Sequence, residues 1–189
     1  MKIIGFVGSP RDGNTKKLVE EALKAAESMG VETQIVHLGK MKIAPCKACD
    51  ACRKTGKCTI NDDFQEAADM LESADGVVFG SPVYFGGVSS QMKAFMDRTR
   101  YLRRKSALKD KVGGAIAVGA SRNGGQETTI QIIHNFFFIH EMIVVSDTKT
   151  AHYGGTGWSG AGDAKEDESG LETSRNLGLH VAEVSKKLV

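Results

Sequence analysis

Residues 2–15 read KIIGFVGSPRDGNT, and this stretch decides the fold. Its first part, residues 2–8, is a short apolar run whose isoleucine and valine content suits a buried strand. After Gly-Ser-Pro, apolar residues recur at helical spacing from residue 15 to residue 29, and Gly30 ends that pattern. A buried strand that leads through a glycine-containing turn into an amphipathic helix predicts a βαβ unit, and hence a parallel sheet.

The same alternation continues along the chain. Further apolar runs that suit strands occur at residues 31–38, 76–80, 112–119 and 142–146, and helices are expected at residues 62–73, 90–103, 126–139 and 171–188. This predicts an α/β fold with a doubly wound, five-stranded parallel sheet. The common order for five such strands is the flavodoxin-like 2-1-3-4-5. We expect one domain over residues 1–189, with an insertion at about 39–61 and a C-terminal loop and helix at about 150–189.

The composition is that of an ordinary soluble protein. Hydrophobic residues make up 41% and charged residues 25%, and the formal net charge is only +2. This charge gives no reason to expect nucleic acid or a membrane surface as a partner, and the apolar runs are too short to span a bilayer. The N-terminus lacks the long apolar core of a signal peptide, so we expect a cytoplasmic protein. In that reducing compartment, clustered cysteines favour metal or redox chemistry over disulfides.

The loop GSPRDGNT, residues 8–15, has the composition of an anion site. It combines glycines with Ser9, Arg11, Asn14 and Thr15 directly before a helix, where free backbone N–H groups and the helix dipole attract anions. It matches neither a Walker A motif nor the dinucleotide fingerprint, so a monophosphate is favoured. A plain strand-to-helix turn remains the alternative.

Two more loops follow strands at the same predicted sheet edge. They are SPVYFGG, residues 81–87, and ASRNGGQET, residues 120–128, and both pair glycines with polar or aromatic side chains. Either loop alone is more simply a solvated connection. Because ligands of doubly wound sheets bind at the carboxyl ends of the strands, the three loops together predict a ligand with a phosphate end and a planar end.

All four cysteines lie in CKACDACRKTGKC, residues 46–58, with the spacing C-x2-C-x2-C-x5-C. Compact runs of this kind bind iron–sulfur clusters. A structural zinc site is one alternative, although such sites usually use cysteine pairs that lie further apart in the sequence. A redox disulfide is another, although it would involve only two of the four cysteines. Both alternatives stay open. Four cationic residues surround the cysteines: Lys47, Arg53, Lys54 and Lys57. We expect them to raise the reduction potential of a bound cluster and to attract an acidic partner protein. The alternative is that they simply keep the loop soluble.

The three loops, together with QMKAFMDR at residues 91–98, resemble the flavodoxin-like, NAD(P)H-dependent FMN reductase superfamily over about the first 150 residues. With its cysteine motif, the chain is similar to the iron–sulfur flavoproteins of archaea and anaerobic bacteria. The resemblance implies one FMN and one [4Fe–4S] cluster per subunit, and electron transfer between a ferredoxin-like donor and a small-molecule acceptor, an oxygen species or a quinone. It also implies a homodimer or homotetramer in which the cluster of one subunit lies near the FMN of another.

The same resemblance assigns residues to each cofactor. It implies that the FMN phosphate is held by Ser9, Arg11, Asn14 and Thr15. It implies that the ribityl chain and ring are lined by Pro82, Val83, Tyr84, Phe85 and Gly86, and flanked by Ser121, Arg122, Gly124 and Gly125. The cluster ligands would be Cys46, Cys49, Cys52 and Cys58. No residue stands out as a general acid or base, so no catalytic residue is predicted.

Two other functions fit the sequence. One is an NAD(P)H-dependent FMN or quinone reductase in which the cysteines hold a structural metal. The other is a flavin- or metal-binding module without enzymatic activity. The sequence contains no separate nicotinamide-binding motif, which favours the electron-transfer protein.

Overall fold

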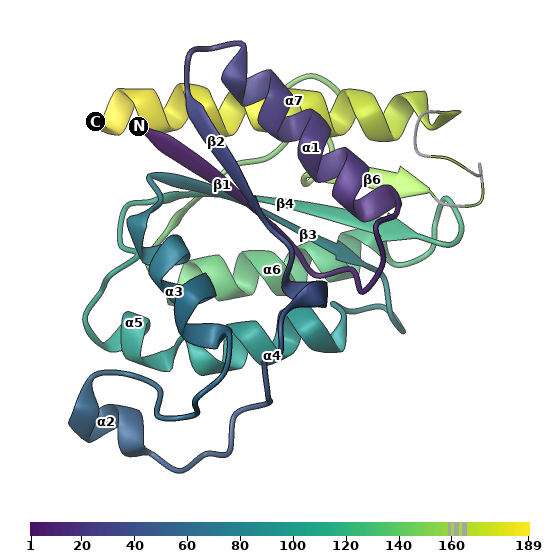
Figure 1. Ribbon diagram of the computed structural model, residues 1–189. Coiled ribbons are helices and arrows are strands. Elements are labelled where there is room, and N and C mark those ends of the chain that lie inside the picture. Colours follow the sequence, from purple (N-terminus) through teal and green to yellow (C-terminus); the bar gives the residue numbers. More distant parts are fainter. Residues whose placement is uncertain (159, 161–162, 164–165) are drawn as a thin grey trace.

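The computed structural model describes residues 1–158, 160, 163 and 166–189. It has a parallel β-sheet between two layers of helices (Figure 1). One face is covered by α1 (Asn14–Glu27) and α7 (Glu168–Leu188). The other face is covered mainly by α3 (Phe64–Ser73), α4 (Ser90–Arg98) and α6 (Gln126–Ile139). The predicted α/β class, with helices on both faces, is therefore confirmed.

The strands are β1 (Lys2–Val7), β2 (Glu32–Val36), β3 (Gly76–Pro82), β4 (Val112–Gly119), β5 (Ile143–Val144) and β6 (Gly155–Trp158). Their order along the main path is β2-β1-β3-β4-β5, and all pairs are parallel. This confirms the predicted order. Because β1, β3 and β4 end at the same edge, the three loops that follow them meet there.

The sixth strand is a difference from the sequence analysis, which expected only a loop at residues 150–170. β6 pairs in parallel with residues 116–119 of β4, beyond the two residues that β5 covers. Its sequence, GTGW, lacks an apolar alternation because its glycines face packed neighbours. A Cβ at Gly157 would lie 2.4 Å from the Leu18 side chain, and one at Gly155 would lie 2.7 Å from the Ser174 hydroxyl. Close packing against α1 and α7 therefore replaces the side chains that usually mark a strand.

Two other elements differ from the expected pattern. The predicted helix at 90–103 is broken at Thr99 into α4 and α5 (Arg100–Arg104), and the Thr99 hydroxyl donates to the Met96 carbonyl at 2.8 Å. The segment after β2, which showed no period, contains the 3-10 helix η1 (Leu38–Lys40) and the short helix α2 (Ala51–Thr55). None of the helices in the described part of the chain combines the length and hydropathy needed to cross a bilayer.

The contact between α1 and α7 depends on Gly178. A Cβ at this position would lie 2.0 Å from the Ala22 carbonyl oxygen, so a Gly178→Ala substitution must push the two helices apart. Alanine in a helix interior gains about 1 kcal/mol in propensity, but overpacking against backbone costs about 1–3 kcal/mol or more. We expect a net loss of unfolding free energy, measured by chemical denaturation. Glu172→Ala, at an exposed position of α7, serves as the control and should change it little. A more stable Gly178→Ala protein would contradict this packing.

Candidate functional site

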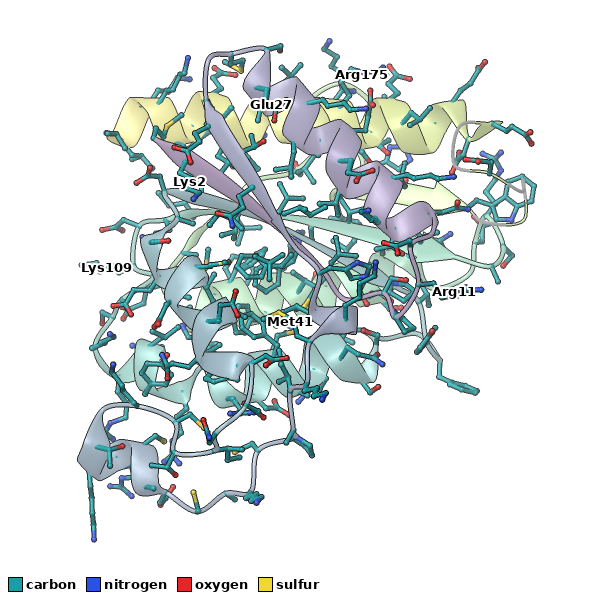
Figure 2. All side chains as sticks on the ribbon, viewed as in Figure 1. Lys2, Arg11, Glu27, Met41, Lys109 and Arg175 are labelled. Carbon is teal, nitrogen blue, oxygen red and sulfur yellow. The ribbon has the colours of Figure 1, made fainter. Side chains whose placement is uncertain are left out.

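A cavity of about 470 Å³ opens at the carboxyl ends of β1, β3 and β4, beside the start of α1. Its lining residues are Ser9, Arg11, Asp12, Gly13, Asn14, Thr15, Pro82 and Val118. The structure therefore brings together the four residues predicted to hold a phosphate, along with Pro82 from the second loop. Figure 2 shows Arg11 on the side of the molecule where α1 begins.

The N-terminus of α1 suits an anion. Gly13 is its N-cap residue, and neither a side-chain cap nor an acidic residue in the first turn is present within this described helix. The first N–H groups of a helix have no intrahelical acceptor, and the dipole there is positive. Ser9 shapes the loop that leads into it, because its Oγ accepts from the Arg11 N–H at 3.2 Å and lies 3.0 Å from the Arg11 carbonyl oxygen.

Asp12 is an acidic residue of this cavity that the sequence analysis did not single out. Its carboxylate is paired with Lys40 and with Lys16, whose Nζ lies 3.3 Å away. The hydrogen bond from Lys40 is the main cause that holds the pKa of Asp12 below its usual value. The two lysines thus offset a negative charge that would otherwise oppose a bound phosphate.

The segment after β2 supports the same loop from behind. His37 Nε2 donates to the Ser9 carbonyl oxygen at 2.7 Å. Gly39 lies against that carbonyl so closely that a Cβ there would be 1.9 Å from its oxygen. Sequence reasoning missed both residues, because they follow a different strand and their partners in the loop are distant in sequence.

The second loop makes a tight turn after β3. Tyr84 and Gly87 exchange backbone hydrogen bonds of 2.9 and 3.1 Å, and Phe85 and Gly86 between them both have positive φ. The Val83 N–H donates to the Val118 carbonyl at 2.9 Å, which joins this loop to β4. The turn leaves Tyr84 43% exposed and Phe85 fully exposed. Aromatic surface of this kind beside the cavity is available to a planar ligand or a second chain.

Two buried serines connect the first and second loops. Ser89 Oγ donates to the Gly8 carbonyl oxygen at 2.6 Å and accepts from the Met92 N–H, so it also caps α4. The Ser89 N–H in turn donates to Ser81 Oγ at 2.9 Å. The serines therefore position the loops, a role that the pattern SPVYFGGVSS did not reveal.

The third loop is held by Gln126 and by β6. The Gln126 side chain donates to the carbonyls of Ser121 and Gly157 at 2.7 and 3.1 Å and accepts from the Gly124 N–H at 2.8 Å. Trp158 Nε1 donates to the Ala120 carbonyl at 3.0 Å, and the Arg122 guanidinium lies 5.3 Å from the centre of the Trp158 ring system. Gly157 and Trp158 belong to a segment that was expected to be a loop, whereas Gln126 begins the predicted helix at residues 126–139.

The third loop also touches the second. A Cβ at Gly125 would lie 3.2 Å from Gly86 Cα and from the Val83 side chain. The predicted ring-binding residues thus share one edge of the sheet, although only Pro82 among them lines the main cavity. Contact of Val83, Tyr84, Phe85, Gly86, Ser121, Arg122, Gly124 and Gly125 with a flavin ring stays a prediction.

The cysteine segment forms a second cavity. All four cysteines line it, together with residues of α4 and α5. Ala48 and Asp50 have left-handed backbone conformations, which turn the chain around the cavity, and the Ala48 N–H points at Cys46 Sγ at 3.4 Å. Cys46 and Cys49 are exposed, whereas Cys52 and Cys58 pack against the core. Thiolates are the usual ligands of zinc and of iron–sulfur clusters, so this cavity is the candidate metal centre, although the described residues show no ready-made group of three ion ligands.

Comparison with known proteins identifies the family. The model of the NADPH-dependent FMN reductase family matches residues 1–155. An iron–sulfur flavoprotein of Methanocaldococcus jannaschii is 59% identical over 98% of this chain and 98% of its own. An iron–sulfur flavoprotein of Methanosarcina thermophila is 47% identical over 100% of this chain and 93% of its own. The chain belongs to the iron–sulfur flavoprotein family.

This iron–sulfur flavoprotein is accordingly an oxidoreductase of the FMN reductase type, and FMN is its flavin. The family predicted from the loops and the cysteine motif is confirmed. A flavodoxin, WrbA-like protein from Agrobacterium tumefaciens is 24% identical, covers 98% of this chain and 97% of its own, and superposes with a TM-score of 0.71. That likeness shows the flavodoxin-like fold.

The neck of the cysteine loop in this iron–sulfur flavoprotein is closed by Asp62 and Arg98. Asp62 accepts from the N–H groups of Ala44 and Phe64 at 2.9 and 3.2 Å, and so joins the two ends of the loop. Arg98, the last residue of α4, forms two hydrogen bonds with the Asp62 carboxylate, at 2.6 and 2.8 Å. Burial raises the pKa of Asp62, but its hydrogen bonds, above all from Arg98, outweigh this and hold the pKa below the usual value.

Sequence reasoning missed this ion pair. Arg98 lies three residues after the buried Phe95, so its position belongs to the apolar face of α4. A charge on the apolar face of a predicted helix was the available signal, because a buried arginine requires a paired acceptor. Which acceptor it would find was not readable from the sequence.

Proposed function

We propose that this chain transfers electrons between a ferredoxin-like donor and a small-molecule acceptor, an oxygen species or a quinone. FMN would be held at the cavity beside α1, and one [4Fe–4S] cluster by Cys46, Cys49, Cys52 and Cys58. When bound, FMN exchanges electrons in pairs and a cluster exchanges them one at a time. The observation that carries the proposal is that all four cysteines line one cavity in a chain that also forms a cavity at the N-terminus of α1.

The spacing of the cysteines supports a cluster over a single zinc ion, because structural zinc sites usually use cysteine pairs that lie further apart in the sequence. With Zn–S bonds of about 2.3 Å, the sulfurs of a zinc site must lie within about 4 Å of one another. The cysteines of a cluster bind separate irons, so their sulfurs need not meet around one ion, and here all four line one cavity.

The chain's own residues do the binding and positioning. The first turn of α1 would receive the phosphate, and the side chains of Ser9, Asn14 and Thr15 would add hydrogen bonds. The second and third loops, joined by the contact between Gly86 and Gly125, would hold the ring. Hydrogen bonds already hold all three loops before a flavin binds, so less conformational entropy is lost on binding.

The partners are proposed from charge and placement. Lys47, Lys54 and Lys57 are exposed around the cysteines, which supports an acidic ferredoxin as the electron donor. Figure 1 shows the α2 segment projecting beyond α4 and α5, away from the edge where α1 begins. A homodimer or homotetramer in which one subunit's cluster lies near another's FMN would shorten the path that electrons must take.

A second function is favoured by one finding. The matching family model is that of NADPH-dependent FMN reductases. If the cysteines held only a structural metal, NADPH would reduce the FMN directly, and a quinone or free FMN would be the acceptor. The two functions differ in their first reductant.

The test is a metal, sulfide and flavin analysis of protein purified without oxygen. We expect about four iron and four acid-labile sulfide atoms per FMN, as one [4Fe–4S] cluster requires. Reduced ferredoxin should then bleach the flavin much faster than NADPH does, as measured by stopped-flow absorbance. Zinc without sulfide, combined with rapid bleaching by NADPH, would instead establish the second function.

A further inference from the structure

Arg98 is a buried arginine at the wall of the cysteine cavity. Its side chain is 0% exposed, and it lines the same cavity as the four cysteines. Its guanidinium lies 4.2 Å above the centre of the Phe64 ring, so apolar surface covers one of its faces. A charge in such a place interacts with its neighbours far more strongly than a solvated one.

Both terminal nitrogens of Arg98 are satisfied. Nη1 donates to the Ala44 carbonyl at 3.0 Å and to Asp62, while Nη2 donates to the Ile60 carbonyl at 3.2 Å and to Asp62. Four of its five N–H groups are therefore used at the neck of the loop. The fifth, on Nε, is buried and has no partner among the described residues. An unpaired donor on a buried charged group is more costly than one on a neutral group, which points to an acceptor that binding of a cofactor supplies.

Cys58 is the candidate acceptor. It is partly buried against the core cluster that contains Phe64, and it lines the cavity together with Arg98. Burial lowers the pKa of Arg98, but the neighbouring Asp62 and Cys58 side chains outweigh this and raise it. Thiolate sulfur accepts charge-assisted hydrogen bonds.

We propose that Arg98 is a positioning residue for the cluster, whose Nε–H donates to the Cys58 sulfur or an adjacent cluster sulfide and thereby raises the cluster's reduction potential. This inference rests on the proposed function, because it requires a cluster at the cysteines. Reduction adds negative charge to a cluster, so a nearby donor and cation stabilise the reduced state more than the oxidised one. Asp62 moderates the effect by pairing with the same cation.

The alternative is that Arg98 only closes the neck of the loop. A purely structural clamp would change how much cluster the protein retains, but not the potential of the cluster that it does retain. Two substitutions separate these roles, because one should weaken and the other should strengthen the electrostatic stabilisation of the reduced cluster. Arg98→Lys keeps a positive charge but removes the Nε–H, whereas Asp62→Asn keeps the Nε–H and removes the carboxylate that offsets its charge.

The experiment is an anaerobic redox titration of the loaded proteins, followed by EPR of the reduced cluster. For Arg98→Lys we expect about a tenfold fall in the ratio of reduced to oxidised cluster at a fixed potential, a shift of about 59 mV for one electron. For Asp62→Asn we expect the ratio to rise. Arg104→Lys, a matched change at an exposed position of α5, should leave the ratio within about twofold.

Unchanged ratios in the loaded Arg98→Lys and Asp62→Asn proteins, or shifts of the same sign, would overturn the inference. A second measurement needs no substitution. In unsubstituted protein carrying ¹⁵N-arginine, electron–nuclear double resonance of the reduced cluster should show a coupled arginine nitrogen, and its absence would also overturn the inference. Purified protein without iron and sulfide would refute the proposed function as well, whereas a full cluster with unshifted potentials would refute this inference alone.

Discussion

Cys49→Ser protein, purified without oxygen, should contain less than about a tenth of the normal iron and sulfide and a full complement of FMN. These are the only four cysteines of the chain, so no other thiol can replace the lost ligand. A serine hydroxyl rarely ionises near neutral pH and does not match the soft thiolate as a ligand. Cys49 is exposed, so its substitution removes little core packing, and the loss should be confined to the cluster.

The measurement is a parallel determination of iron, acid-labile sulfide and FMN. Lys57→Ser, next to Cys58 and exposed, is the matched control and should keep its cluster. Retention of normal sulfide by Cys49→Ser would show that this thiol is not a ligand. Loss of FMN together with iron would instead show that the two cavities depend on one another, contrary to their separate supports in this structure.

Asn14→Asp should weaken FMN binding by at least about 100-fold, which is about 2.7 kcal/mol. The substitution is nearly isosteric and places a negative charge at the first residue of α1, where the phosphate is expected. At an effective dielectric constant of about 20, two unit charges about 4 Å apart repel by about 4 kcal/mol, and a phosphate carries more than one charge. The positive end of the helix dipole would then be occupied by the protein's own carboxylate.

Riboflavin, which lacks the phosphate, is the matched ligand control. Its dissociation constant, measured by quenching of flavin fluorescence in the apoprotein, should change by less than about threefold in Asn14→Asp. The apoprotein itself should become slightly more stable, by about 0.3–1 kcal/mol, because a carboxylate at a helix N-terminus is favourable. Equal weakening of FMN and riboflavin would mean that the phosphate lies elsewhere.

The sequence predicted those parts of the fold that leave a periodic pattern. The five strands of the main sheet path and the helical layers follow from apolar runs and amphipathic helices, whereas the predicted strand order is simply the common one for such sheets; the structure confirms both. β6 could not be predicted in the same way, because Gly155 and Gly157 pack by having no side chain. A strand that depends on close backbone approach has no hydrophobic pattern to detect.

The candidate site shows the same division. Loop composition and the cysteine spacing located both cavities, since anion-binding turns and cysteine clusters use few residue types. The supporting residues were missed because their partners are distant in sequence, as with Ser89 and the Gly8 carbonyl, or Arg98 and Asp62. Such pairs become visible only when the strands are placed side by side.

β5 and β6 pair with different parts of β4, and this arrangement affects where the protein can be shortened. The family model ends at residue 155, the first residue of β6. A fragment cut there would lose the partners of residues 117–119 and the indole that anchors Ala120, although every residue predicted to contact FMN would still be present. The end of the family-model match is therefore not a folding boundary, because β6 and α7 pack into the same sheet and core as the strands before them.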